Sequence, residues 1–197
     1  MDPILKLLHR IYLRAIPYAA YLCAQFYILL GLISDRLVGT IAEPSLIVSR
    51  IPFFFGEKLR YFYYKKLLIS VGYGVTFKYG SFCQYRKTKI GNRVLIGYFD
   101  TIGEVDIGND VLIGSNVNIL SGVQQHAFDD PDKLIWDTPA AGRRMITIGS
   151  DVWIGNDAVI ANDIGTRCVV AINSMVIRKV RNHTLVGGNP AEKLMRI

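Results

Sequence analysis

The chain contains three histidines, and one of them lies where a base that transfers protons would be useful. His126 stands in a long segment, residues 120–147, whose middle is rich in Pro, Asp and Gly, whereas His9 and His183 have polar or basic neighbours. An imidazole has an unperturbed pKa of about 6.5, so at neutral pH it can accept a proton from a hydroxyl group that attacks an electrophile. His126 is therefore a candidate general base, and the alternative is a solvated loop histidine.

The cysteines offer less chemistry. Cys23, Cys83 and Cys168 are odd in number and widely spaced. We expect reduced, mostly buried thiols of a cytosolic protein, with no partner that would make one of them a nucleophile. Neither the cysteines nor the histidines have the spacing of metal ligands, so the sequence predicts acid–base chemistry that requires no metal.

A six-residue repeat predicts the scaffold that must position His126. Between residues 90 and 177 an aliphatic residue recurs at about every sixth position, mostly followed by Gly, as in Ile90-Gly, Ile96-Gly, Ile107-Gly, Ile113-Gly, Ile148-Gly and Ile154-Gly. A fixed period predicts a solenoid, in which each unit buries its apolar face on its neighbours. Six residues suit one side of a triangular parallel β-helix: a short strand, one inward aliphatic side chain, and Gly where the chain turns tightly.

The repeat is interrupted in two ways. The isoleucine of the next unit follows Ile102 after five positions and Ile160 after four positions. We interpret these short units as bulges or shortened turns at corners. The longer interruption, residues 120–147, predicts an extended loop. Long loops on rigid scaffolds often carry catalytic and binding residues, which favours a functional role for His126.

The chain resembles a known family in three places: the Ile-Gly-x-x-Val units, the stretch from Ile148 to Ile160, and the closing segment Val186-Gly-Gly-Asn-Pro-Ala-Glu-Lys-Leu-Met-Arg196. These are similar to the left-handed β-helix hexapeptide-repeat acyltransferases of the sugar and polysaccharide O-acetyltransferase type. The resemblance implies a mainly β fold, with a left-handed parallel β-helix over residues 70–197 and a protruding loop at 120–147. An N-terminal helical segment, residues 1–69, would precede it, and its part from 57 to 68 would cap the solenoid.

The resemblance also implies an activity. Members of the family transfer acetyl from acetyl-CoA directly to a hydroxyl or amine, without an acyl-enzyme, and bind the donor between subunits of a homotrimer. The family's catalytic histidine lies in the loop position that His126 occupies. For this chain we expect a sugar or lipid-linked saccharide acceptor, in the assembly of bacterial cell-surface polysaccharide or lipopolysaccharide.

Further site residues are carried over by position in the motifs. The resemblance implies that Asp100 and Trp153 face the substrate, and Arg143 could meet an anionic acceptor. It implies that Asn156, Arg178, Lys179, Lys193 and Arg196 bind CoA, the four cations at its phosphates. Asp129 or Asp130 could orient the imidazole. The alternative for each residue is an ordinary corner or surface side chain.

The N-terminal segment carries most of the basic excess. The net charge of the 197 residues is +7, and up to residue 66 nine Lys and Arg face four Asp and Glu. These cations flank apolar runs instead of forming a groove with interleaved aromatics, which favours an anionic membrane surface over nucleic acid as partner.

Residues 15–33 carry no charge and are long enough to cross a bilayer, whereas residues 37–55 would make a poor spanning helix. No cleavage site indicates a secretory signal. Lys6, Arg10 and Arg14 place the N-terminus in the cytosol by the positive-inside rule, and a single crossing would then separate the catalytic domain from its cytosolic donor. We expect either a re-entrant or interfacial segment on the cytoplasmic face of the membrane, or a helical cap packed on the solenoid or on other subunits.

Two other functions remain open from the sequence. The acceptor could be an amine or a small metabolite, as in serine or amino-sugar acetyltransferases. Alternatively, the chain could be a non-catalytic membrane module whose β-helix is a platform for a partner. Failure to bind CoA would favour the second.

Overall fold

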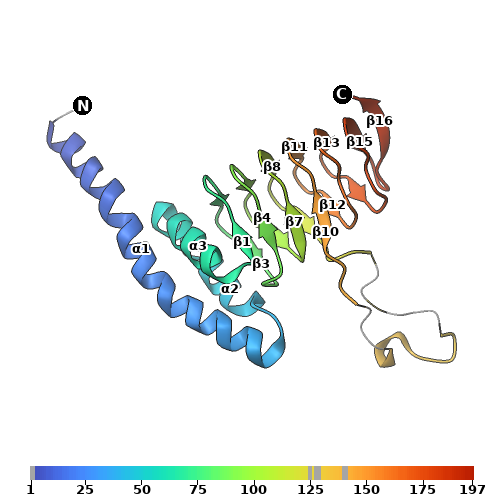
Figure 1. Cartoon of the computed structure of the whole chain (residues 1–197), viewed down its shortest axis with the longest axis horizontal. Helices are drawn as coiled ribbons and strands as arrows, with labels where there is room; N and C mark the ends of the chain where they lie inside the picture. Colours follow the sequence, from blue (N-terminus) through green and yellow to red (C-terminus); the bar gives the residue numbers. More distant parts are fainter. Residues whose placement is uncertain (1–2, 124–125, 127–129, 139–141) are drawn as a thin grey trace.

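The structure is a computed structural model that describes residues 3–123, 126, 130–138 and 142–197. Three helices come first: α1 (Pro3–Val38), α2 (Ala42–Ser49) and α3 (Phe53–Leu67). A solenoid of short strands follows, with the helices at its N-terminal end and residues 130–138 lying outside it, away from its side (Figure 1).

The strands form three sheets, one on each side of the solenoid. Sheet A contains β1 (Ser70–Val71), β4 (Lys89–Ile90), β7 (Val105–Ile107) and β10 (Ile146–Ile148). Sheet B contains β2 (Thr76–Phe77), β5 (Leu95–Ile96), β8 (Val111–Ile113), β11 (Val152–Ile154), β13 (Cys168–Val170), β15 (Thr184–Gly187) and β16 (Glu192–Arg196). Sheet C contains β3 (Phe82–Cys83), β6 (Thr101–Ile102), β9 (Asn118–Ile119), β12 (Val159–Ile160) and β14 (Met175–Val176). All pairs are parallel except β15–β16.

The repeat determines this register. In sheet B, Val152 pairs with Val111 and with Cys168, so equivalent units lie directly above one another. The aliphatic residues of each unit point inward and are buried, which gives a continuous core along the axis. Each such side chain stabilises the fold by about 1.5–3 kcal/mol. The solenoid predicted from the six-residue period is confirmed.

The glycines have a different role from the one expected. A Cβ on Gly97 would lie 1.9 Å from the carbonyl oxygen of Gly114 in the next coil, so side chains are excluded there by close stacking. The left-handed turn falls two positions later, for example on Phe99 (φ 61°) and Asp110 (φ 60°). The expectation that Gly makes the tight turn was therefore wrong, because Gly is required where the corner of one coil rests on the next.

The two short units lie at equivalent places. Ile102 ends β6 in sheet C, and the chain enters sheet A at Val105. Ile160 ends β12 in sheet C, and Ile164 then bridges Ile148 and Val180 beside sheet A. Both irregularities are thus shortened corners between sheets C and A, as expected.

The helices cover the first coil. The Tyr64 hydroxyl of α3 accepts a hydrogen bond from the Cys83 N–H at 3.0 Å, and its ring lies 4.5 Å from that of Phe77. The predicted capping helix is therefore present, and it begins at Phe53 instead of residue 57. Of the three thiols, those of Cys83 and Cys168 are buried and that of Cys23 is exposed on α1, in line with the expectation of mostly buried thiols.

Candidate active site

The segment that carries His126 leaves the solenoid at one edge. It follows β9 of sheet C and returns at β10 of sheet A, so it projects from the edge between these sheets, called here the C–A edge (Figure 1). His126 is exposed, as an imidazole must be to meet a substrate. Asp129 lies outside the described residues. Asp130 forms an ion pair with Lys133 (2.9 Å) and accepts a hydrogen bond from Asp132 N–H, so its carboxylate serves a local turn.

Arg143 anchors the returning end of this loop. Its Nε donates to Glu104 Oε1 at 3.0 Å, and its guanidinium lies 4.3 Å from the centre of the Tyr85 ring. The Glu104 side chain is only 7% exposed, so Arg143 is the counter-ion of a nearly buried carboxylate. Its expected contact with an anionic acceptor remains a prediction, but these two partners already hold the guanidinium against the solenoid.

Arg144 makes a second anchor next to the first. Its N–H donates to Ser121 O at 2.9 Å, which joins the outgoing and returning parts of the loop. Its guanidinium donates to both oxygens of Asp163 (3.1 and 3.2 Å) and to Asn162 Oδ1. The base of the loop is therefore fixed by side chains from two different coils.

Asp100 lies inside the solenoid. Its side chain is 0% exposed and stands in the inward column of sheet C, where the next coils have Val117 and Ala158. Oδ1 accepts the Val117 N–H at 2.8 Å, whereas Oδ2 has no hydrogen-bond partner among the described residues. Burial raises the pKa of Asp100 to about 7, and backbone hydrogen bonds oppose this shift. The position does not support the expected contact with an acceptor, because an inward side chain does not face solvent.

Trp153 and Asn156 lie away from the loop. Trp153 is an outward, exposed residue of β11 on sheet B, beside the exposed Leu112 of β8. Asn156 lies at the edge between sheets B and C, where its Oδ1 accepts the Ser115 N–H of the preceding coil at 2.9 Å. A single chain therefore does not bring these two residues together with His126.

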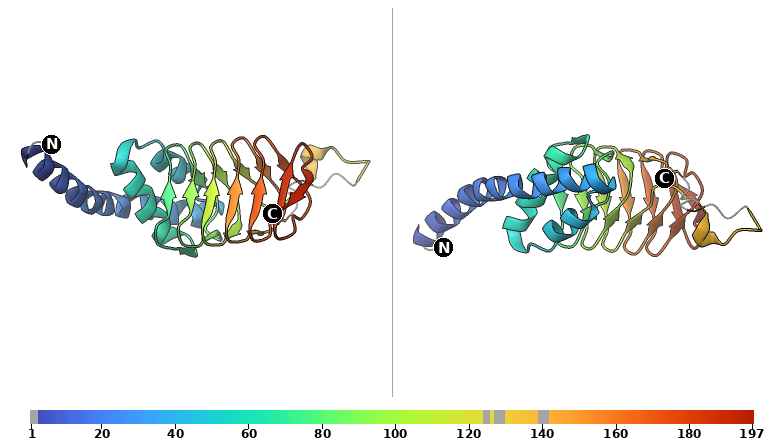
Figure 2. Two further views of the ribbon diagram at one scale, coloured as in Figure 1. Left: turned by 90° about the horizontal axis from the view of Figure 1, so that it is seen from above. Right: turned by 90° about the horizontal axis from the view of Figure 1, so that it is seen from below.

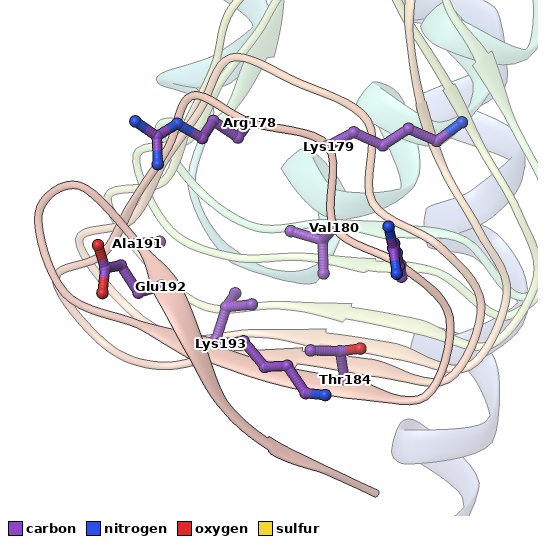
Figure 3. Close-up of a pocket in the computed structure, with 9 residues that line it drawn as sticks. Arg178, Lys179, Val180, Thr184, Ala191, Glu192 and Lys193 are labelled. Carbon is purple, nitrogen blue, oxygen red and sulfur yellow. The ribbon is translucent and has the colours of Figure 1, made fainter.

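Three of the four cations expected at the CoA phosphates line one cavity. A pocket of about 500 Å³ at the C-terminal end of the solenoid is bordered by Arg178, Lys179 and Lys193, together with Arg181, Thr184 and Glu192 (Figure 3). The side chains of Arg178 and Lys179 point to opposite sides of it. Arg196, the fourth, is exposed on β16 and does not line this pocket.

One side of the pocket lies on the C–A edge, and its other side is formed by β15, β16 and the turn between them on sheet B. Arg178 and Lys179 connect β14 of sheet C to Val180, which bridges to Ile164 beside sheet A. This is two coils beyond the corner that carries the loop, or about 10 Å along the axis at the usual strand spacing. Between them, a second cavity of about 330 Å³ is lined by Thr147, Asp163 and Lys179. The C–A edge thus carries the segment with the exposed imidazole at one place and two cations of the basic pocket, Arg178 and Lys179, at another.

Sequence reasoning missed Glu104 and Arg181. Glu104 lies in the five-residue unit, whose irregular register concealed that its carboxylate turns toward the loop. Arg181 lines the basic pocket and could have been found from its position in Arg178-Lys-Val-Arg181, since these cations flank the bridging Val180. No group of three or more His, Cys, Asp or Glu suited to a metal ion occurs in the described part of the chain.

Comparison with known proteins is consistent with this geometry. No protein-family model matches the chain. Chloramphenicol acetyltransferase of Escherichia coli is 32% identical over 119 residues, which is 53% of this chain and 57% of the relative. The chain thus spans a little over half the length of the curated relatives that it matches.

Two solved structures extend the likeness. The hexapeptide-repeat acetyltransferase VCA0836 of Vibrio cholerae is 26% identical, with a TM-score of 0.64 over 91% of this chain and 92% of that one. A galactoside acetyltransferase in complex with coenzyme A has the same fold, with a TM-score of 0.70 at 23% identity over 85% and 82% of the two chains. The chain is therefore similar in sequence and fold to hexapeptide-repeat acetyltransferases, and the expected left-handed β-helix with an N-terminal helical segment is confirmed.

Proposed function

We propose that this protein is an acetyl-CoA-dependent O-acetyltransferase that acts on a sugar hydroxyl, with His126 as general base. The observation that supports this most is that the exposed His126 belongs to the segment at the C–A edge of a rigid solenoid, where Arg178 and Lys179 of the basic pocket also lie. VCA0836, a relative with the same fold, has also been solved with acetyl-CoA.

The reaction is a direct transfer. His126 takes the proton of the acceptor hydroxyl while that oxygen attacks the thioester carbon of acetyl-CoA. The tetrahedral intermediate then collapses, the bond from carbon to sulfur breaks, and the imidazolium returns its proton to the leaving thiolate of CoA. Removing the base from such a step slows it by about 10²–10⁴-fold.

The chain's cations give the donor a place to bind. Arg178, Lys179, Arg181 and Lys193 border one pocket and can meet several phosphate oxygens at once, since guanidinium and ammonium groups form charge-assisted bonds to phosphate. Arg196 extends this positive surface along β16. The pantetheine arm would follow the C–A edge from the pocket toward the loop.

We also propose that the protein is a homotrimer. Trp153 and Asn156 lie on a different side of the solenoid from His126, so they can serve the same substrate only if a second copy supplies them. We propose that the site forms between subunits, and that the enzyme works on the cytoplasmic face of the membrane in polysaccharide or lipopolysaccharide assembly. The basic, apolar N-terminal helix supports that location.

A second class of acceptor should also be assayed. The identity to chloramphenicol acetyltransferase, at 32%, favours a small hydroxylated compound as the alternative to a saccharide. Both alternatives use the same base and donor, and they differ only in what occupies the acceptor side of the loop.

The experiment measures release of the CoA thiol from acetyl-CoA by detergent-solubilised protein with sugars, lipid-linked saccharides, chloramphenicol and amines, beside His126→Ala. We expect acceptor-dependent release that falls by about 10²-fold or more in the variant. His183→Ala is the matched control, because His183 is also an exposed turn histidine and should leave the rate unchanged. Equal rates for His126→Ala and the wild type would refute the assignment of the base, and absence of CoA binding by titration would refute the enzyme.

A further inference from the structure

Helix α1 has two apolar faces, and the fold covers only one of them. The inner face is a stripe of small residues and one isoleucine, Ala20, Ala24, Ile28 and Gly31, all buried. It packs on α3: a Cβ on Gly31 would lie 2.7 Å from Leu67 Cδ1. The outer face carries large side chains that are 46–76% exposed, at Ile11, Tyr18, Leu22, Phe26, Leu29, Ile33 and Leu37.

The outer residues form one continuous stripe. From Tyr18 to Leu37 they follow one another at intervals of three or four residues, which aligns them along one side of an α-helix. At 100° per residue, this stripe lies roughly opposite the buried one. Figures 1 and 2 show α1 as the outermost layer, with α3 between it and the solenoid. A contiguous apolar face of this size indicates an interaction surface.

The charges at the N-terminal end of α1 indicate what covers the stripe. Within residues 3–34 the charged side chains are Lys6, Arg10 and Arg14, and there is no Asp or Glu. These three cations are exposed at the N-terminal end of α1, and tyrosines at positions 12, 18 and 21 lie near them. Cations and tyrosines at the end of an apolar stripe suit the head-group region of an anionic bilayer.

The packing of α1 on α3 bears on whether the helix would cross a bilayer or lie in its surface. By length and composition α1 could cross a bilayer, and 22% of its most apolar window is buried. However, α3 packs against the middle of α1, with ring pairs Tyr12–Phe54 (6.1 Å) and Tyr21–Phe62 (5.5 Å). Lys65 and Lys66 of α3 are exposed. A crossing would carry these charges into hydrocarbon or strip α1 from α3, and both are unfavourable.

We infer that α1 is a monotopic lipid-binding helix, whose outer stripe lies in the plane of an anionic membrane surface while the chain stays on one side. The solenoid and α3 then take the place of the polar face that an interfacial helix normally turns to water. One consequence of this inference, that the acceptor is held at the same membrane, rests on the proposed function. The lipid contact itself is independent of the chemistry.

The test is flotation of the purified full chain with vesicles of phosphatidylcholine containing about one third phosphatidylserine, beside neutral vesicles. We expect the wild type to float with the anionic vesicles. Leu22→Glu/Phe26→Glu should lose at least about tenfold in apparent affinity, since two charges enter the stripe. Tyr73→Glu/Ile172→Glu, at exposed apolar residues of the solenoid, is the matched control and should bind like the wild type. Coenzyme A titration of every variant tests folding and the donor site separately.

A wild type that binds CoA but does not float would overturn the inference, as would flotation unchanged in Leu22→Glu/Phe26→Glu. Loss of a lipid-free oligomer in that variant, without vesicle binding by the wild type, would mean that a second copy covers the stripe. To separate lying from crossing, His9→Cys in a Cys23→Ser background is labelled with a membrane-impermeant maleimide added outside the vesicles. Full labelling is expected, and protection that disappears in detergent would indicate a crossing helix.

Discussion

The two ends of the solenoid differ in the environment of their cationic side chains. At the N-terminal end, Arg60 is fully buried, and its guanidinium donates to the carbonyl oxygens of Phe77 (2.9 Å), Ile51 (2.8 Å), Ser49 (3.3 Å) and Val48 (3.4 Å). At the C-terminal end, every residue of β16 is exposed, and Arg178, Lys179, Arg181 and Lys193 surround an open cavity.

The difference separates structural cations from binding cations. Arg60 is satisfied by the protein's own carbonyl groups, and with Tyr64 it ties α3 to the first coil. Burial lowers the pKa of Arg60, although nearby Tyr64 and Glu57 oppose this shift. The cations at the other end remain available to phosphate. Substitutions at the closed end should therefore change stability, and substitutions at the open end should change affinity.

Arg60→Met should give the largest effect. The methionine keeps the apolar stem but removes the donors, and we expect unfolding to become easier by about 3 kcal/mol, because buried carbonyl groups lose their partners. Urea denaturation measures it. Arg50→Met is the control, since Arg50 is exposed in the same region and should shift stability by less than about 0.5 kcal/mol. A loss of CoA affinity in folded Arg60→Met, without a loss of stability, would contradict the comparison.

Asp100→Asn should stabilise the fold, in contrast to Arg60→Met. The buried carboxyl has its pKa raised from the ordinary value of 3.8 to about 7, so the folded state holds the proton more tightly than the unfolded state. Stability of the wild type should therefore fall as pH rises from about 4 to 7 and level off above that range. Asparagine removes this loss, and we expect it to stabilise the fold by about 2 kcal/mol at pH 8, within a limit of about 4 kcal/mol set by the shift.

Denaturation at several pH values tests the Asp100 prediction. Asp157→Asn is the matched control, because Asp157 is an exposed corner residue. Parallel pH profiles for the wild type and Asp100→Asn would show that the carboxyl does not titrate in this range.

At the open end, Arg178→Ala/Lys193→Ala should weaken CoA binding by about tenfold or more, equivalent to about 1.4 kcal/mol. The loss should shrink at high salt, because exposed charges are screened. Calorimetric titration measures it. Lys87→Ala/Arg167→Ala removes the same charge from exposed positions elsewhere on the solenoid and should leave the affinity unchanged. An equal loss in both variants would mean that net charge, and not the pocket, binds the donor.

The smallest effect should come from Arg143→Met. Removal of the Arg143 guanidinium leaves the nearly buried Glu104 without a counter-ion, and we expect this to destabilise the fold by about 1 kcal/mol. We also expect kcat to fall, because the loop that carries His126 is held less firmly. The KM for the acceptor should stay constant. A selective rise in that KM at unchanged stability would instead support the acceptor contact expected from the sequence.

The six-residue period was enough to predict the solenoid, its corners and the loop. Inward aliphatic residues recur so regularly that the core follows from the spacing alone. The same rule could have placed Asp100 correctly. It stands two residues before Ile102, as Val117 stands two before Ile119, so it occupies an inward position. The five-residue unit that follows Ile102 obscured this.

Other features depend on contacts that spacing does not contain. The burial of Arg60 follows from carbonyl groups supplied by α2, the turn after it and β2, which meet only in the folded chain. The side or edge of the solenoid on which Trp153, Asn156 or Lys179 lies depends on the sum of all corner lengths, so one short unit moves these residues to another side. That Arg178 and Lys179 share the C–A edge with the segment of His126 could therefore be established only from the structure.

The antiparallel strand β16 has a consequence for the state of the protein in solution. A stack of parallel coils ends in strands whose outer backbone groups are free to pair, and two such ends could join into a filament. On sheet B, β16 pairs with β15 in the opposite direction and presents Glu192, Lys193 and Arg196 at the new border. Reversed direction and charge make that border a poor template for another solenoid, so β16 protects the protein against end-to-end polymerisation.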